Sequence, residues 1–425
     1  MKPTRWLSWG LILALVLVVL LYLRMAFEDP VDYVRGGFGS RDFKAYYVAV
    51  RLLQRGESFY DPMRQLAEHD ALNLPRDDTL YIYPSAFALA LLPLANLSIE
   101  NAAQVWNGIN LVLLTAAFVL VIRATGLDRR LGVQVLWFVI LAALAFPTRL
   151  AFRVGQANIL LLFLLALGLY AATVQRDVLA GSALGLAALI KIFPIAFLLW
   201  MLARRDWRVM VWGAVVVAGV LVLSALSMAL LIQNPWMDLT YLTQVLPALT
   251  ETRARLGNES VNGFVSRWMM PPFETRLAVI GLSALIAGAT VVALWQWARG
   301  GNDHASWAWR TSTGQLQLDW AVLLTALLLV SSITWESTFV LLIIPLAIYV
   351  RAWIELGTPR ELLLLLGASY LLINATPLIA MVDILWLNSP IMNSLSFFGT
   401  GLVWGIGMVL LYRLQNPAHW SQSYG

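Results

Sequence analysis

Long apolar stretches alternate with short polar segments along most of this chain. A membrane-spanning helix needs roughly 20 consecutive apolar residues, and the first stretch of that kind covers residues 6–25. Further apolar stretches lie at residues 100–122, 131–148, 157–174, 209–232, 274–298, 318–333, 339–350, 361–376 and 392–412. With an interrupted apolar stretch between residues 180 and 203, the pattern predicts an all-α polytopic membrane protein with about twelve spans and a single domain over residues 1–425.

The positions of Lys and Arg predict how the spans are oriented. Cytoplasmic flanks of membrane helices are enriched in these residues. Lys2 and Arg5 precede the first apolar stretch, and Arg413 follows the last. We therefore expect both termini in the cytoplasm, and two polar loops, at about residues 26–83 and 233–273, on the other side of the membrane.

The first outer loop is expected to contain short helices. Residues 42–55 and 62–73 have amphipathic patterns that suit helices lying on the membrane surface. Residues 84–97 are apolar but short, and if they crossed the membrane the basic cluster at residues 123–130 would lie outside. Because that conflicts with the cytoplasmic preference of basic residues, we expect a juxtamembrane or re-entrant helix there.

Lys191 interrupts an apolar stretch that ends at Arg204 and Arg205. In one continuous helix this lysine would lie at mid-bilayer, which costs at least about 2.5–3.5 kcal/mol. Pro194 also disfavours a continuous helix at that point. Two short helices that meet at Lys191 near the outer face remove both problems.

Composition excludes several classes of site. The chain is 60% hydrophobic and 12% charged, whereas soluble domains are about one-quarter charged. It has no Cys and only three His, so disulfides, thiolate chemistry, a His-rich metal site and a Ser–His–Asp triad are poorly supplied. Cytoplasmic Lys and Arg account for much of the net charge of +5, and no nucleic-acid partner is implied.

The predicted topology gathers polar side chains at the outer face, several of them within apolar sequence. Ionisable residues in such positions are costly and are functional candidates by default. The candidates are Asp42, Lys44, Tyr46, Tyr47, Tyr83, Arg149, Arg153, Gln156, Asn158, Lys191, Asn258, Asn262, Trp335 and Glu336.

Asp42 lies just beyond the first span, where a carboxylate has room to act as general base on a substrate hydroxyl. The alternative is a helix N-cap or a solvated loop acid. Asp61, which precedes Pro62, is better explained as a helix cap.

The other candidates also have two interpretations each. Lys191 suits a phosphate partner or a snorkelling lysine. Arg149 and Arg153 share one face if helical, and suit a donor phosphate or lipid headgroups. Gln156 and Asn158 are hydrogen-bond donors to a substrate or helix caps, and Glu336 is a second acid or a partner in a structural ion pair.

Several short motifs occur in an order that resembles glycosyltransferase family 87. They are Arg41-Asp42-Phe43 with Tyr46-Tyr47, Arg55-Gly56, Tyr60-Asp61-Pro62, Tyr83-Pro84, Gly155-Gln156-Ala157-Asn158, the glycine-rich segment ending at Lys191, Arg204-Arg205-Asp206-Trp207, Asn258 with Ser260, Asn262 and Gly263, and Ser332-Ile333-Thr334-Trp335-Glu336. Each motif is short, but together they extend from about residue 40 to residue 350.

The resemblance implies a GT-C fold and an enzyme that takes a sugar from a polyprenyl-phosphate donor on the non-cytoplasmic face. The family is similar to polyprenyl-phosphate-mannose-dependent α-mannosyltransferases that act on glycolipids; mannose is the implied sugar, with arabinose or another hexose as alternatives. An acid in the first outer loop serves as base, which corresponds to Asp42. The family tends to carry His after the Trp-Glu pair, where this chain has Ser337 and Thr338.

The residues suit this reaction without a cofactor. A polyprenyl phosphate is a good leaving group, so one carboxylate is enough to deprotonate the acceptor. Lys191, with Arg149 or Arg153, would offset the charge on the departing phosphate. A single displacement inverts the anomeric centre, and no metal is required.

Two other classes of protein compete with this interpretation. A flippase or transporter for a lipid-linked sugar keeps its key charges near the bilayer midplane, whereas the charged candidate residues of this chain gather at the outer rim. A polymerase or ligase that uses the same lipid chemistry is not separated from a transferase by the sequence.

Overall fold

The computed structural model describes residues 5–34, 40–74, 79–130, 132–250, 257–299, 312–356, 359–376 and 389–415. Within these ranges all regular structure is helical, apart from one isolated β-bridge between Asn258 and Trp335. Residues 35–39, 75–78 and 251–256, which belong to the two predicted outer loops, lie outside the described residues. The predicted all-α class is confirmed.

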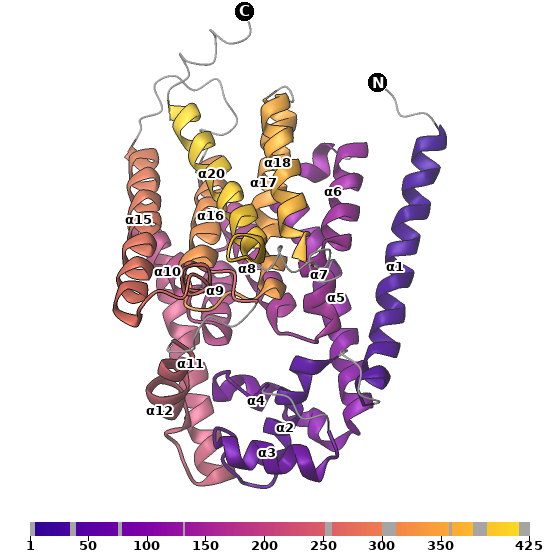
Figure 1. Cartoon of the computed structure of the whole chain (residues 1–425), viewed down its shortest axis with the longest axis vertical. Coiled ribbons are helices and arrows are strands. Elements are labelled where there is room, and N and C mark those ends of the chain that lie inside the picture. Colours follow the sequence, from indigo (N-terminus) through magenta and orange to yellow (C-terminus); the bar gives the residue numbers. More distant parts are fainter. Residues whose placement is uncertain are drawn as a thin grey trace, which may run out of the picture.

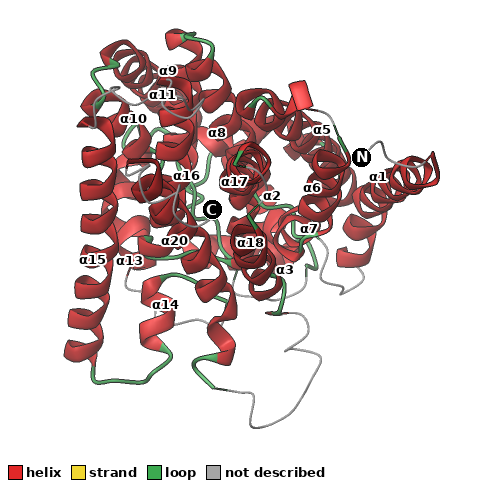
Figure 2. Cartoon of the chain, turned by 90° about the horizontal axis from the view of Figure 1, so that it is seen from above, coloured by secondary structure: helices red, strands yellow, loops and turns green. Residues whose placement is uncertain are grey.

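Seven helices in the described ranges are long and apolar enough to cross a membrane. They are part of α1 (Arg5–Val34), α5 (Ile99–Thr125), α11 (Trp207–Ile232), α15 (Pro272–Arg299), α16 (Ser312–Val330), η5 (Glu336–Leu342) with α17 (Ile343–Glu355), and η7 (Met392–Ser394) with α20 (Leu395–Gln415). The other predicted spans form shorter helices, α8 (Asn158–Thr173), α9 (Asp177–Ile190), α10 (Ile195–Ala203) and α18 (Arg360–Ile373). The chain is therefore a multi-pass membrane protein, with α1 and α15 at opposite edges of the bundle (Figure 2).

The region predicted as one span over residues 131–148 is bent. It divides into α6 (Val133–Leu144) and α7 (Phe146–Arg153), which meet at 49°. Pro147 occupies the first turn of α7, where a proline is tolerated but cannot continue the preceding helix. The predicted outer loop that begins at Thr148 is therefore mostly helix.

The predicted first outer loop folds into α2 (Arg41–Gln54) and α3 (Pro62–Ala71), and α4 (Ser85–Leu91) follows it; all three lie at the end of the molecule away from the start of α1 (Figure 1). The first two were predicted to within about two residues, and Asp61 caps α3 by accepting from the Met63 N–H. The expected surface position is wrong for α2. Ten of its fourteen residues are buried, because α3, α4 and the start of α5 enclose it.

The two-helix interpretation around Lys191 is confirmed. The α9 helix ends at Ile190, Lys191 is extended, and α10 begins at Ile195. At the other end of α10, Arg204 forms an ion pair with the fully buried Asp319, which also accepts from the Trp200 indole at 3.1 Å. Arg204 is thus an internal partner of α16, which the sequence did not indicate.

Cysteine labelling tests the orientation of this helix pair. Ile192 and Arg205 are both exposed and lie at opposite ends of α10, and the chain has no cysteine of its own. Ile192→Cys should react with an impermeant maleimide from outside, and Arg205→Cys only from the cytoplasmic side. Labelling of both positions from the same side would contradict the predicted topology.

Candidate active site

The start of α2 docks against the end of α7. The first N–H groups of a helix and its last carbonyls have no partners within the helix. Here the Ser40 N–H donates to the Arg153 carbonyl at 2.7 Å, and the Asp42 N–H donates to the Val154 carbonyl at 2.9 Å. The free N–H groups at the start of α2 therefore pair with the free carbonyls at the end of α7. This contact fixes Asp42 beside the segment that leads into α8.

Gly155 makes this contact possible. Its φ is +70°, and a Cβ built there would lie 2.9 Å from the Cβ of Phe43 in α2. The Trp106 indole donates to the Gly155 carbonyl at 2.7 Å, so α5 holds the same turn from the other side.

Gly155→Ala should destabilise the protein by about 1–3 kcal/mol, because it adds left-handed strain, and should also displace α2. Gly126→Ala is the matched control: its φ is +71°, but nothing lies within 4 Å of a Cβ built there. Thermal unfolding in detergent should show a loss for both variants, and sugar transfer should fall only for Gly155→Ala. Equal activity of the two variants would show that Gly155 is not needed to position the active site.

Asp42 is not the N-cap of α2, because Ser40 occupies that position. The carboxylate of Asp42 is partly exposed, and its Oδ2 accepts from the Gln156 side-chain amide at 2.7 Å. Asp42 therefore belongs to an interaction between elements that are 114 residues apart in the sequence.

A continuous polar network connects Gln156 to Lys191, and we call it the site network. Its members are Asp42, Gln156, Asn158, Lys191, Ser337 and Thr338. The Gln156 Oε1 accepts from the Ser337 hydroxyl at 2.6 Å and from the Asn158 amide, which also reaches the Thr338 hydroxyl at 3.3 Å.

Lys191 closes the site network. Its Nζ donates to the Thr338 hydroxyl at 3.3 Å, and its charge lies within electrostatic range of Asp42. One carboxylate and one ammonium group, predicted separately from the sequence, are therefore brought to the same site by Ser337 and Thr338.

Two buried tyrosines lie beside Asp42. The Tyr46 hydroxyl donates to the Tyr83 hydroxyl at 3.1 Å and accepts from the Ala157 N–H at 3.1 Å. Burial raises the pKa of both phenols, and the nearby charge of Asp42 raises it further. Both phenols remain protonated at neutral pH, so they supply hydrogen bonds rather than charge.

The second outer loop supports the segment that carries Ser337 and Thr338. The amides of Asn258 and Asn262 both donate to the Ser332 carbonyl at 3.1 Å. Glu259, which the sequence did not indicate, forms a buried ion pair with Arg267 at 2.6 Å. These contacts therefore hold the loop against residues 332–334.

The family follows from comparison of the sequence with known proteins. A model of glycosyltransferase family 87 matches residues 81–332, which is more than half of the chain. The chain belongs to glycosyltransferase family 87. The family resemblance found in the sequence is confirmed, and with it the expected GT-C fold of a membrane glycosyltransferase.

Two individual proteins resemble this family 87 enzyme. An alpha-(1->3)-arabinofuranosyltransferase of Corynebacterium glutamicum is 26% identical over 339 residues, which is 78% of this chain and 72% of that protein. The crystal structure of ArnT from Cupriavidus metallidurans in the apo state is 17% identical, with a TM-score of 0.46, and covers 94% of this chain and 77% of that one.

Three other predicted site residues of the family 87 enzyme have contacts outside the site network. Arg149 and Arg153 are exposed on α7, and Arg149 is within electrostatic range of Tyr22 and Tyr370, on the side of α7 that faces α1 and α18. Tyr47 donates to the Leu97 carbonyl at 2.7 Å and so fastens α2 to the segment before α5.

Three further predicted residues are buried or half-buried. Lys44 is fully buried within α2. Trp335 is half-buried and pairs with Asn258 in the β-bridge. Glu336 is half-buried and lies near Thr376 and the Glu259–Arg267 pair.

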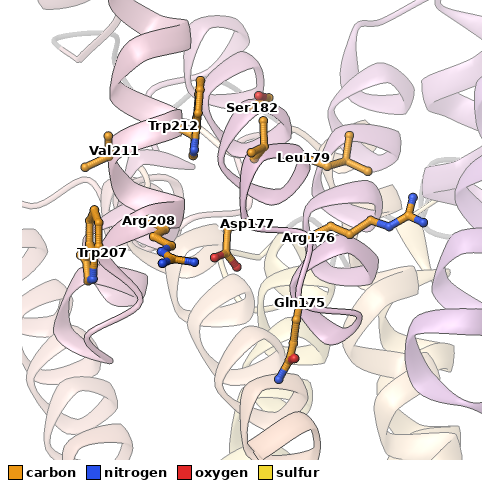
Figure 3. Close-up of a pocket in the computed structure, with 10 residues that line it drawn as sticks. Gln175, Arg176, Asp177, Leu179, Ser182, Trp207, Arg208, Val211 and Trp212 are labelled. Carbon is orange, nitrogen blue, oxygen red and sulfur yellow. The ribbon is translucent and has the colours of Figure 1, made fainter.

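A cavity of about 730 Å³ lies away from the site network, between the N-terminal ends of α9 and α11 (Figure 3). Arg176, Asp177, Trp207, Arg208 and Trp212 line it. Since α9 has 14 residues, its two ends are about 21 Å apart, and Lys191 follows the far end. This cavity is therefore separate from the candidate active site.

Proposed function

We propose that this family 87 enzyme moves a sugar from a polyprenyl-phosphate donor to a glycolipid or glycan acceptor on the non-cytoplasmic face of the cell membrane. Asp42 is the general base, and Lys191 binds the donor phosphate. The observation that carries the proposal is the site network, which joins a partly exposed carboxylate to an ammonium group within electrostatic range.

The reaction requires one base and one cation. Asp42 takes the proton of the acceptor hydroxyl while that oxygen forms a bond to the anomeric carbon. The bond from the anomeric carbon to the phosphate oxygen breaks, and Lys191 stabilises the negative charge that develops on the departing polyprenyl phosphate. Attack opposite the leaving group inverts the configuration of the anomeric carbon.

Gln156 has a positioning role in this scheme. Its side-chain N–H donates to Asp42, and its Oε1 accepts from Ser337 and Asn158. These two bonds fix the orientation of the Gln156 amide, so that its N–H points at Asp42. This hydrogen bond fixes the position of the Asp42 carboxylate, which the proposed base needs. Ser337 and Thr338, at the place where the family tends to carry His, thus connect the base side of the site to the phosphate side.

Two donor sugars are favoured by different observations. The motifs resemble mannosyltransferases, which favours mannose, and the curated relative is an arabinofuranosyltransferase, which favours arabinofuranose. The two sugars differ in ring size, so a direct comparison separates them.

The test uses purified protein in nanodiscs, labelled polyprenyl phosphates that carry mannose, arabinofuranose, glucose or galactose, and a bacterial glycolipid extract as acceptor. Transfer of label from a polyprenyl phosphate, and none from the matching nucleotide sugar, is the expected result. Movement of the donor across a liposome bilayer without any product would support a flippase instead. Processive extension of one acceptor would support a polymerase.

A further inference from the structure

A second carboxylate, that of Asp238, lies at the outer end of the molecule. Asp238 belongs to α12 (Met237–Thr240), which lies beside the end of α11 and near α4 (Figure 1). Its Oδ1 accepts from the backbone N–H of Ser85 at 3.1 Å and from the Ser85 hydroxyl at 2.5 Å. The Ser224 hydroxyl of α11 lies 2.7 Å from the Ser85 hydroxyl. Oδ1 therefore ties α12 to the first turn of α4.

The other carboxylate oxygen has no such role. The Oδ2 of Asp238 is buried and accepts no hydrogen bond from any residue that the structure describes. A buried acceptor without a donor costs about 1–3 kcal/mol, and more when it is charged, so such atoms are rare in folded proteins. The link to α4 needs only Oδ1 and leaves Oδ2 available for a donor from outside the chain.

Two tyrosines lie near this carboxylate, Tyr60 and Tyr241, and Tyr83 adjoins them; we call these three residues the tyrosine wall. Asp238 lies within electrostatic range of the Tyr60 and Tyr241 hydroxyls. The rings of Tyr60 and Tyr241 are 6.1 Å apart and inclined by 30°, and the Tyr60 hydroxyl donates to the Tyr83 carbonyl at 2.8 Å.

The tyrosine wall also reaches the site network. Tyr83 bonds to Tyr46 and lies within electrostatic range of Asp42 on one side and of Tyr241 on the other. Asp238 is thus connected to the reaction centre on the side of Asp42, whereas Lys191 reaches it through Thr338.

The backbone beside Asp238 is unusual as well. A π-helical turn, Tyr241–Val245, follows α12 directly and begins with a residue of the tyrosine wall. Such turns are rare and are frequent at functional sites.

We propose that Asp238 and the tyrosine wall form a subsite that binds a sugar ring of the acceptor; this rests on the proposed transfer function. Oδ2 accepts a sugar hydroxyl in a charge-assisted hydrogen bond, and the small exposed parts of the tyrosine wall, whose residues are 6–8% exposed, contact the sugar ring. The subsite belongs to the acceptor because the acceptor hydroxyl must approach Asp42, and the donor phosphate lies at Lys191.

Asp238→Asn tests the subsite. The variant keeps a carbonyl oxygen for Ser85 but replaces the free carboxylate oxygen with an N–H₂ donor. We expect the KM for the acceptor to rise about 10- to 100-fold, the range expected for a hydrogen bond to a charged group, while kcat and the KM for the donor stay within about twofold. Ser224→Ala is the control: it weakens the link to α4 and should lower the thermal midpoint without changing the acceptor KM.

Two results would overturn the subsite. One is an unchanged acceptor KM in Asp238→Asn with a thermal loss like that of Ser224→Ala, which would make Asp238 only a link to α4. The other is an equal rise of the donor and acceptor KM values. If Asp238→Asn does not fold, Tyr241→Ala decides: it should raise the acceptor KM, and Tyr241→Phe should restore it because the ring is retained.

A binding measurement separates this inference from the proposed function. Saturation-transfer NMR with methyl α-mannopyranoside and methyl α-arabinofuranoside detects sugar binding in Asp42→Asn, which does not turn over. Binding that is lost when Asp238→Asn is added supports the subsite even if no transfer is ever found. Binding that is unaffected by Asp238→Asn contradicts it even if the wild-type protein transfers sugar.

Discussion

Asp42→Asn is expected to lower sugar transfer by about 100- to 10,000-fold, the usual contribution of a positioned general base. Asparagine has the size of aspartate and can still present an oxygen to the Gln156 amide, so the contact between α2 and the start of α8 should survive. It cannot accept the acceptor proton. Single-turnover transfer with a saturating labelled donor measures the effect, and donor affinity should be unchanged because Lys191 is intact.

The chain supplies a matched control for this substitution. Asp61 is a true N-cap, accepting from the Met63 N–H at 2.9 Å, and asparagine is as good an N-cap as aspartate. Asp61→Asn should therefore keep both fold and activity. Asp42→Glu should recover little, because moving a catalytic group by about 1 Å can cost 100-fold. A folded Asp42→Asn enzyme with near wild-type transfer would end the assignment of Asp42 as base.

Lys191→Ala is expected to weaken donor binding by about 2–4 kcal/mol, roughly 30- to 1,000-fold, because it leaves the donor phosphate without its cation. Lys191→Arg should restore only part of this, since the guanidinium is larger and planar and the Thr338 contact is specific to the ammonium geometry. Binding of a labelled polyprenyl-phosphate sugar to protein in nanodiscs measures the loss directly.

Lys191→Met separates the two interpretations of this lysine. It keeps an apolar stem of similar length, so a residue that only snorkels would be replaced with little effect. Arg149→Ala should change donor affinity by less than about threefold, because Arg149 is exposed and lies on the face of α7 toward α1 and α18. Unchanged donor binding in Lys191→Met would show that Lys191 does not bind the donor phosphate.

Most helices could be predicted because the apolar stretches are long and end at basic residues or prolines. The break after α9 was predictable because Lys191 and Pro194 are both unfavourable inside a membrane helix. The bend between α6 and α7 was not, because Pro147 stands at the end of the apolar stretch and the polar residues Thr148 and Arg149 that follow indicated a loop rather than a second helix. The burial of α2 was missed because it depends on the helices that pack around it.

Charged and amide side chains of the site were easier to find than hydroxyls. Asp42, Gln156, Asn158 and Lys191 stand out because each is a polar group at the edge of apolar sequence. Ser337 and Thr338 occur in a segment of ordinary loop composition, and only the fold shows that their hydroxyls connect Gln156 to Lys191.

The partners of the charged residues could not be predicted from one sequence. The Asp319 partner of Arg204 is 115 residues away, and the buried acid of the second outer loop pairs with Arg267 rather than with substrate. The amides of Asn258 and Asn262, which were predicted to bind substrate, both donate to the Ser332 carbonyl. The partners of these two asparagines depend on which backbone carbonyl lies opposite the loop, and this is a property of the folded chain.

The site network also determines how late in synthesis the candidate active site can form. Gln156 is 114 residues beyond Asp42 and 181 residues before Ser337. At a synthesis rate of about 5–20 residues per second, the ribosome needs roughly 10 to 35 seconds to reach Ser337 after Gln156 has emerged. During that interval the amides at the head of α8 lack their hydroxyl partners, and the insertion machinery or bound water must satisfy them. The segment η5 (Glu336–Leu342), which carries Ser337 and Thr338, is therefore required for chemistry whose proposed base was synthesised much earlier.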